Sequence, residues 1–282
     1  MSHVTGRRHA VVARPRTADG EHEHVGDAGG EVAAFFDVDN TLVRGASTFH
    51  LARALHARGF FRARDIARFA VHQARYAVYG ENAQHLDRVR AKALCLVAGH
   101  SVDEVCSVGE QVYDDVLALR IFPGTKALLE AHLAAGHQVW LVTAAPVEVG
   151  GLIARRLGAT GALATVPEHA DGVYTGRLDG ELMHGAAKAR AARDLAARTG
   201  IDLERSYAYG DSMNDVDLLG TVGHPCAVNP EPRLRRLART SGWDVREFRQ
   251  PTRRAARTGV KAGSWVAAGW AATSLLRRAS RR

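Results

Sequence analysis

The sequence predicts an α/β protein with a doubly wound, Rossmann-like parallel sheet and a helical cap inserted after the first strand. Short apolar runs at residues 32–36, 138–143 and 206–210 are separated by helical patterns, which is typical of a parallel sheet. The segment between the first two runs shows helical periodicity with no clear strand. Acidic residues directly follow the first and third runs.

Length and composition predict a folded, soluble, cytoplasmic protein. The chain has 282 residues, enough for one large domain or a domain with a substantial insert. Its hydrophobic content is 46%, but no uncharged apolar stretch reaches the ~18 residues expected of a membrane span. Residues 1–30 lack the apolar core of a secretory signal. Three cysteines without metal-ligand spacing favour buried thiols in a reducing compartment.

The chain divides into an arm, a core in two pieces, a cap and a tail. The arm lacks periodicity and is predicted to be disordered. The cap has helical faces, one of which carries Val105, Val108, Val112, Val116 and Leu119. The predicted boundaries are 1–30 for the arm, 31–45 and 120–250 for the core, 46–119 for the cap and 251–282 for the tail.

Glycines delimit the elements of the second core piece. Three helical patterns end at a glycine, and the strands between them are rich in β-branched and aromatic residues. The stretch VYTGRLDG is interpreted as a hairpin-like segment. The predicted order is helix 124–135, strand 138–143, helix 147–157, hairpin 173–180, helix 185–199 and strand 206–210.

Reactive side chains follow three strands at the sheet edge where open α/β sheets bind ligands. They are Asp37 and Asp39 after the first strand, Thr143 after the second, and Asp211 and Asp215 after the third. Lys188 lies at the start of the helix before the third strand. Because Mg²⁺ prefers hard oxygen ligands, four acids and a lysine predict a Mg²⁺ site. Taken singly, each residue also fits a turn, a helix cap or a solvated position.

Four motifs together resemble the signatures of the haloacid dehalogenase superfamily. They are Asp37-Val38-Asp39-Asn40-Thr41, Thr143, Lys188 and Gly210-Asp211-Ser212-Met213-Asn214-Asp215, in this order. The resemblance covers about residues 32–230, and the insert resembles the cap of the phosphoserine-phosphatase-like subfamily IB. It implies a Mg²⁺-dependent phosphatase that acts on a small phosphorylated substrate.

The resemblance also implies a role for each residue. Asp37 would attack phosphorus and form an aspartyl-phosphate, and Asp39 would protonate the leaving oxygen and then activate water. Thr143 and Lys188 would hold phosphoryl oxygens. The residues at the metal would be Asp37, the backbone carbonyl of Asp39 and Asp211 as ligands, with Asp215 and Asn214 around them. A phosphotransferase with the same intermediate is an alternative that the sequence leaves open.

One position departs from the phosphoserine branch of the family. That branch carries a glutamate five residues after the motif threonine, where it meets the substrate ammonium. Here the position is Ala46. A buried ammonium without a counter-ion binds poorly, so the departure argues against phosphoserine. Arg44, Ser47 and His50 are candidates to face the pocket, with surface or cap-packing roles as the alternatives.

The excess positive charge belongs to the tail. The net charge is +8, but residues 252–282 hold eight basic residues and no acid, which leaves 30 basic and 30 acidic residues elsewhere. Nucleic-acid binding is therefore not expected. Residues 262–276 are uncharged, contain two tryptophans and are flanked by arginines. They fit an interfacial helix at the inner face of the membrane, and equally a packed helix or a disordered end.

A regulatory role is an alternative from another functional class. The Ala/Arg-rich composition resembles actinobacterial subfamily IB proteins, some of which are associated with control of morphological differentiation. Intact motifs favour catalysis, because a pure binding protein has no need for so many mutually repelling acids.

Overall fold

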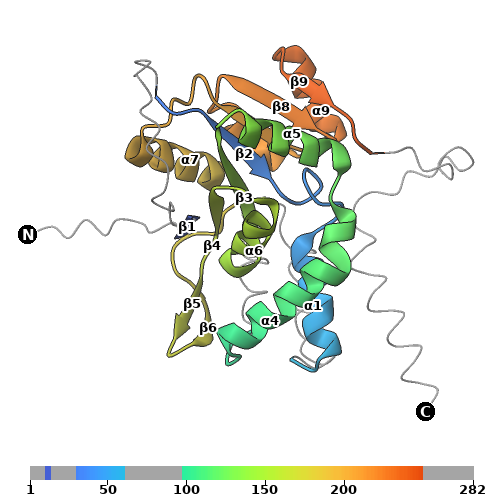
Figure 1. Cartoon of the computed structure of the whole chain (residues 1–282), viewed down its shortest axis with the longest axis vertical. Coiled ribbons are helices and arrows are strands. Elements are labelled where there is room, and N and C mark those ends of the chain that lie inside the picture. The colour runs from blue at the N-terminus through green and yellow to red at the C-terminus, as the bar shows by residue number, and fades with distance from the viewer. Residues whose placement is uncertain (1–9, 14–29, 61–96, 250–282) are drawn as a thin grey trace, which may run out of the picture.

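The computed structural model describes residues 10–13, 30–60 and 97–249. Its main feature is one seven-stranded sheet, which runs through the middle of the core (Figure 1). The strand order is β1-β4-β3-β2-β7-β8-β9, and every neighbouring pair except β1 with β4 is parallel. The strands are β1 (Ala10–Ala13), β2 (Ala33–Asp37), β3 (Gln138–Pro146), β4 (Gly161–Thr165), β7 (Tyr207–Gly210), β8 (His224–Val228) and β9 (Asp244–Arg246). The predicted doubly wound α/β fold is confirmed.

Helices cover both faces of the sheet. The side chains of β2 alternate between two apolar clusters: Phe36 packs with residues of α5 and α6, whereas Phe35 packs with residues of α7 and α9. Both rings are fully buried, which explains why the central strand is a continuous apolar run in the sequence. The core helices are α5 (Pro123–Ala134), α6 (Val147–Leu157), α7 (Ala186–Thr199), α8 (Val216–Leu219) and α9 (Pro232–Thr240).

The carboxyl end of β2 lies at the point where the sheet is wound in opposite directions. After β2 the chain builds β3 and β4 on one side and then returns past β2 to build β7, β8 and β9 on the other. The chain connections on the two sides of β2 therefore run in opposite directions from this point. Open α/β sheets usually bind their ligands at such a point. Asp37 is the last residue of β2.

The described part of the predicted cap is helical. It consists of α1 (Ser47–Ala57) and α4 (Val102–Val112), which continues into a π-helical turn at Tyr113–Leu117 and a 3₁₀ turn at Ala118–Arg120. Leu55 of α1 and Val105 of α4 are buried in the same apolar cluster. Residues 61–96 lie outside the described residues, so the full extent of the cap stays a prediction.

Strand β1 corrects one part of the prediction. It lies within the segment predicted to be a disordered arm, yet Ala10–Ala13 pairs with β4 in antiparallel register. A four-residue apolar run is too short to reveal periodicity, and here the exposed edge of β4 supplies the pairing partner. The rest of residues 1–29 lies outside the described residues.

The predicted hairpin at 173–180 is wrong in position. Strand β6 (Val173–Leu178) is a single strand, and its antiparallel partner β5 (Pro167–Ala170) precedes it. The turn is Asp171-Gly172, with φ angles of 51° and 76°. Asp-Gly is a strong hairpin signal, but the short sequence before it shows little strand alternation. The hairpin touches the cap, because Tyr174 N–H donates to the His100 carbonyl at 3.0 Å.

A buried histidine connects α5 to the sheet. The Nε2 atom of His132 lies 2.7 Å from the Tyr209 hydroxyl oxygen, and its Nδ1 atom lies 2.9 Å from Nδ1 of His137. Burial, and then the neighbouring His137, lower the pKa of His132 to about 4. The folded protein therefore disfavours the charged imidazolium at this position.

We expect His132 to make the fold sensitive to acid. The unfolded chain binds a proton on this histidine near its ordinary pKa of about 6.5, whereas the folded protein does not. The contribution of neutral His132 to the free energy of unfolding is therefore fully present above a pH of about 6.5 and is lost as the pH falls toward 4. Between pH 7.5 and 5 the loss should be on the order of 1–2 kcal/mol. Urea unfolding of the wild type and His132→Gln at both pH values measures this. An equally steep pH dependence in the variant would contradict it.

Candidate active site

A buried lysine joins two of the predicted acids. The Lys188 Nζ atom donates to Asp37 Oδ1 at 2.5 Å and to Asp215 Oδ1 at 2.7 Å. Their side chains are 4%, 8% and 1% exposed, so solvent screens these ion pairs weakly. The three groups come from the end of β2, the first turn of α7 and the 3₁₀ turn at Met213–Asp215. Segments far apart in the sequence therefore meet at one edge of the sheet.

Asp211 completes a group of three buried carboxylates. Asp37, Asp211 and Asp215 each offer an oxygen atom, and these atoms lie within 4.8 Å of one another. With all acids ionised, three carboxylates and the Lys188 ammonium leave two formal negative charges. Oxygen donors alone and this residual charge fit a divalent cation such as Mg²⁺. Asp37 and Asp211, two of the three predicted ligands, thus lie in a cluster that fits the ion, while the Asp39 carbonyl as a third ligand stays a prediction.

Burial and mutual repulsion shift the proton affinity of these groups. Burial raises the pKa of Asp37 to about 7, with Asp215 adding to the rise and Lys188 opposing it. Burial, Asp37 and Asp215 together raise the pKa of Asp211 to about 8. Burial alone would lower the pKa of Lys188, but Asp215 and Asp37 outweigh this and raise it above its usual value. The lysine therefore stays charged.

Asp215 organises the loop after β7. Its Oδ2 atom accepts hydrogen bonds from the Ser212 N–H at 3.1 Å, the Ser212 hydroxyl at 3.0 Å and the Asp211 N–H at 3.3 Å. Since Lys188 occupies Oδ1, both oxygens are already engaged, and Asp37 and Asp211 are better suited as direct ligands. The supporting role of Asp215 at the metal stays a prediction, and this geometry is compatible with it. Asn214, predicted to support the metal too, is half-buried on the same turn.

A glycine permits this compact loop. A Cβ atom placed on Gly210 would lie 2.5 Å from the Cβ of Asp215 and 2.8 Å from its Cγ. Any other residue at this position would push the Asp215 carboxylate away from Lys188.

Asp39 and Thr143 lie beside the buried carboxylate group, and the side chain of each takes part in a hydrogen bond. Asp39 Oδ1 accepts the Ser47 N–H at 2.9 Å and the Ser47 hydroxyl at 2.7 Å. Thr143 follows Val142, which is the register partner of Asp37 on β3. Its Oγ1 accepts the Ala145 N–H at 3.1 Å, so the hydroxyl hydrogen remains available for a phosphoryl oxygen. Strand β3 continues past Thr143 to Pro146 after a register shift, so the predicted strand end was too early.

The segment before the tail reaches the site, which the sequence analysis missed. A terminal guanidinium nitrogen of Arg249 lies 3.5 Å from Asp211 Oδ2. Buried Asn229 fixes this segment, since its Oδ1 accepts the N–H groups of Phe248 and Arg249 at 2.7 and 3.0 Å. A polar Asn directly after the apolar strand β8 was the available signal. Nothing in the sequence indicated Arg249.

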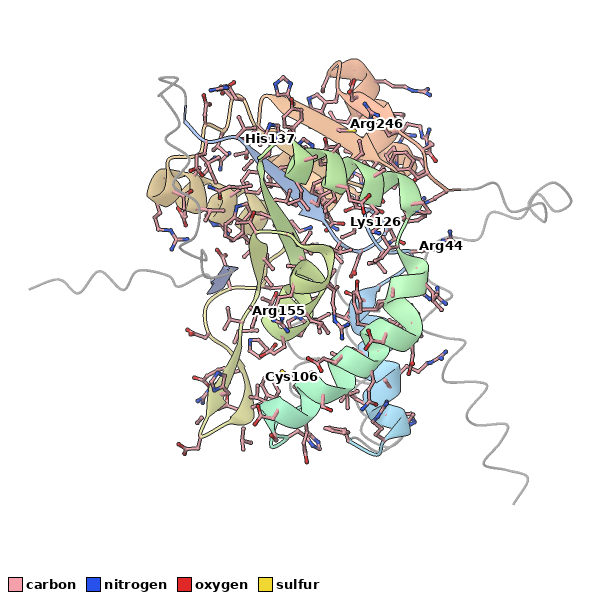
Figure 2. All side chains as sticks on the ribbon, viewed as in Figure 1. Arg44, Cys106, Lys126, His137, Arg155 and Arg246 are labelled. Carbon is pink, nitrogen blue, oxygen red and sulfur yellow. The ribbon has the colours of Figure 1, made fainter. Side chains whose placement is uncertain are left out.

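Several residues where the chain enters the cap were predicted only as candidates to face the substrate pocket. Arg44, labelled in Figure 2, lies where the core and the cap meet, with its guanidinium carbon 5.3 Å from the centre of the Phe122 ring. Ser47 is fully buried and contacts Asp39. Ala46 is exposed at the N-cap of α1, so this position provides no acid for a substrate ammonium.

The sequence of this fold and site matches a known family. Residues 34–220 match the model of the haloacid dehalogenase-like hydrolases. The chain belongs to this family. The predicted family and the prediction of a haloacid dehalogenase-type enzyme are therefore confirmed.

The chain is similar to two curated proteins and to one solved structure. A Mycobacterium tuberculosis protein named phosphoserine phosphatase SerB1 is 51% identical over 251 residues, which cover 89% of this chain and 80% of the relative. A Streptomyces azureus protein named inhibition of morphological differentiation protein is 36% identical over 78% of this chain and 80% of its own length. A solved structure of a Bordetella pertussis Tohama I protein of unknown function is 33% identical, with a TM-score of 0.69 over 78% of this chain and all of that one.

The prediction for the tail is untested. Residues 251–282 lie outside the described residues, so membrane contact through them stays a hypothesis. Among the described helices, none is both long and apolar enough to cross a bilayer. The two described cysteines are free thiols: Cys226 is buried, as predicted, whereas Cys106 is only half-buried.

We expect Lys188→Met to destabilise this hydrolase by about 3–5 kcal/mol at pH 8, because two acids lose their buried counter-ion. The loss should be smaller at pH 6, since protonation of a stranded carboxylate removes a buried charge and stability then rises as pH falls. Arg190→Met is the matched control. Arg190 lies in the same helix and pairs with Glu181 at 2.6 Å, but it is 46% exposed, so its loss should cost less than about 1 kcal/mol. Urea unfolding measures both variants, and equal losses would contradict the expectation.

We expect Gly210→Ala to cost about 1–3 kcal/mol through overpacking against Asp215. It should also lower hydrolase activity at least 10-fold, because the displaced Asp215 moves Lys188. Gly109→Ala in α4 is the control. Among the residues that the structure describes, a Cβ there would meet only Leu152 Cδ2, at an ordinary 3.9 Å, so the helix should gain up to about 1 kcal/mol. Thermal unfolding and activity assays test both, and an active, stable Gly210→Ala protein would contradict the assigned packing.

Proposed function

We propose that this protein is a Mg²⁺-dependent phosphomonoesterase that hydrolyses a small phosphorylated metabolite through an aspartyl-phosphate on Asp37. The observation that carries the proposal is the position of Lys188, which holds Asp37 and Asp215 together beside a third carboxylate. A phosphoryl group at this edge would meet an acid nucleophile and a fixed cation. Bound Mg²⁺ would neutralise charge on the phosphoryl oxygens.

The chain's own residues would carry both chemical steps. An Asp37 carboxylate oxygen would attack phosphorus while the bond to the alcohol oxygen breaks, and that oxygen would take a proton from Asp39. Asp39, now a carboxylate, would then take a proton from a water molecule whose oxygen attacks phosphorus. Inorganic phosphate would leave and Asp37 would be regenerated. Lys188 and the Thr143 hydroxyl would hold the phosphoryl oxygens during both steps.

The proposed substrate is a small phosphomonoester in the cytoplasm, and its identity stays open. The name of the Mycobacterium tuberculosis relative favours phosphoserine. Ala46 argues against it, because the glutamate that would meet the ammonium is absent at this position. Phosphoserine therefore belongs in a substrate panel with phosphomonoesters that lack an amino group.

We expect the purified full chain to release phosphate from members of such a panel with Mg²⁺ and not with EDTA. Asp37→Asn should lower this activity roughly 1,000-fold or more, because an amide cannot serve as the nucleophile. Asp217→Asn, a change at an exposed acid in the first turn of α8, should leave it intact. Mass spectrometry of the quenched wild type should detect a phosphorylated Asp37 peptide. Undiminished Mg²⁺-dependent phosphate release by Asp37→Asn would overturn the proposal.

A phosphotransferase would use the same intermediate. Added glycerol distinguishes the two activities, since phosphate transferred to glycerol indicates a phosphotransferase and inorganic phosphate indicates a hydrolase.

The Streptomyces azureus relative favours a second candidate function, which is control of morphological differentiation. The two functions are compatible if the regulatory effect depends on hydrolysis. An Asp37→Asn gene that replaces the wild-type gene tests this dependence. If the variant gives the same cellular effect as the wild type, regulation is independent of chemistry.

A further inference from the structure

The carboxylate of Asp39 is bound to the first residue of the cap. Both the backbone N–H and the hydroxyl of Ser47 donate to the same oxygen, Asp39 Oδ1, at 2.9 and 2.7 Å. Ser47 is 0% exposed and is the first residue of α1. The partners lie eight positions apart in the chain, so the contact closes the loop that enters the cap.

This contact fixes the direction of the Asp39 side chain. Hydrogen bonds to an ionised acceptor are roughly twice as strong as neutral ones, and two on one oxygen restrain rotation of the carboxylate. The N-terminus of α1 adds a favourable interaction with negative charge, and the Ser47 N–H would otherwise lack an intrahelical partner. The loop itself is tight, with Asn40 at a φ of 66° and its Oδ1 accepting the Gly45 N–H at 3.1 Å.

The arrangement leaves one oxygen of Asp39 for chemistry. Because both Ser47 donors point at Oδ1, a proton on the carboxyl group belongs on Oδ2. In the proposed reaction Oδ2 would give this proton to the alcohol oxygen as its bond to phosphorus breaks and the bond from Asp37 to phosphorus forms. The geometry points to Ser47 as a positioning residue for the general acid, an inference that rests on the proposed function.

A merely structural role of Ser47 predicts a different pattern of defects. A variant with a disturbed cap would lose activity toward all substrates alike. Loss of general-acid positioning slows only substrates whose leaving oxygen needs a proton. Glycerol 2-phosphate has a poor alkoxide leaving group, phenyl phosphate an intermediate one, and p-nitrophenyl phosphate a good one that leaves without full protonation.

The test compares kcat/KM of Ser47→Ala with the wild type on these three esters. Because kcat/KM covers the steps up to formation of the aspartyl-phosphate, it reports on the acid step and omits later hydrolysis. We expect a loss of about 100-fold for glycerol 2-phosphate, less for phenyl phosphate and at most about 3-fold for p-nitrophenyl phosphate. Ser47→Thr, which keeps a hydroxyl, should restore most of the activity toward glycerol 2-phosphate. Equal losses on all three esters, or no loss on any, would overturn the inference.

Two controls separate positioning from folding. Ser206 is equally buried, but its hydroxyl accepts the Ala33 N–H at the opposite, amino-terminal edge of the sheet. Ser206→Ala should therefore lower the free energy of unfolding without any leaving-group dependence. Adding Ser47→Ala to Asp39→Asn should cause no further loss, since the group to be positioned is already gone. A further large loss in the double variant would show that Ser47 acts elsewhere.

Failure of this inference is distinguishable from failure of the proposed function. If the wild type hydrolyses none of the three esters and no other phosphomonoester with Mg²⁺, the proposed function fails and the inference falls with it. If the wild type is active and Ser47→Ala shows a uniform loss, only the inference fails.

Discussion

The ammonium of Lys188 is the interaction on which the site depends. It bridges residues 151 and 27 positions away in the chain, so it forms only when β2, α7 and the loop after β7 are packed together. Without it, Asp37 and Asp215 would lose their buried counter-ion, only the partly exposed Arg249 beside Asp211 would offset the charge of three carboxylates, and uptake of a proton by one of them would be favoured. The compact turn permitted by Gly210, and the hydrogen bonds to Asp215, hold one of its two partners in place. The acidic cluster is thus paired in the folded protein and still keeps negative charge for a divalent cation.

The two acids of the first motif are attached to different parts of the molecule. Asp37 ends a buried central strand, whereas the carboxylate of Asp39 is held by the first residue of the cap helix α1. The motif therefore connects a rigid sheet edge to the element that would cover the substrate. This division of roles gives a physical reason for an insert directly after the first strand, because an insertion at any other strand would not control the orientation of Asp39.

The C-terminal side of the core also bears on the site. Phe248 packs against Gly124 at the start of α5, where a Cβ atom would overlap its ring, and Arg249 then lies beside Asp211. Asn229 joins this segment to the first motif, since its Nδ2 donates to the Asn40 carbonyl at 3.4 Å. The described part of the chain therefore ends, at Arg249, next to the acidic cluster, so a change in the position of Phe248 and Arg249 would alter the charge around Asp211.

The sequence by itself determined the class of fold, and it predicted Asp37, Lys188, Asp211 and Asp215, which the structure brings together. The continuous apolar run before Asp37, the glycines that end α6 and α7, and the ordered motifs were enough, because they depend on local periodicity and on the rule that parallel strands end at one edge. Tertiary structure alone decided the rest. β1 needed the edge of β4, the contact of Lys188 with Asp215 needed α7 packed beside the loop after β7, and the contact of Ser47 with Asp39 depended on the fold of the loop between them. Arg249 reaches Asp211 only through packing at Gly124 and Asn229, and no pattern in the sequence encodes such a contact between distant segments.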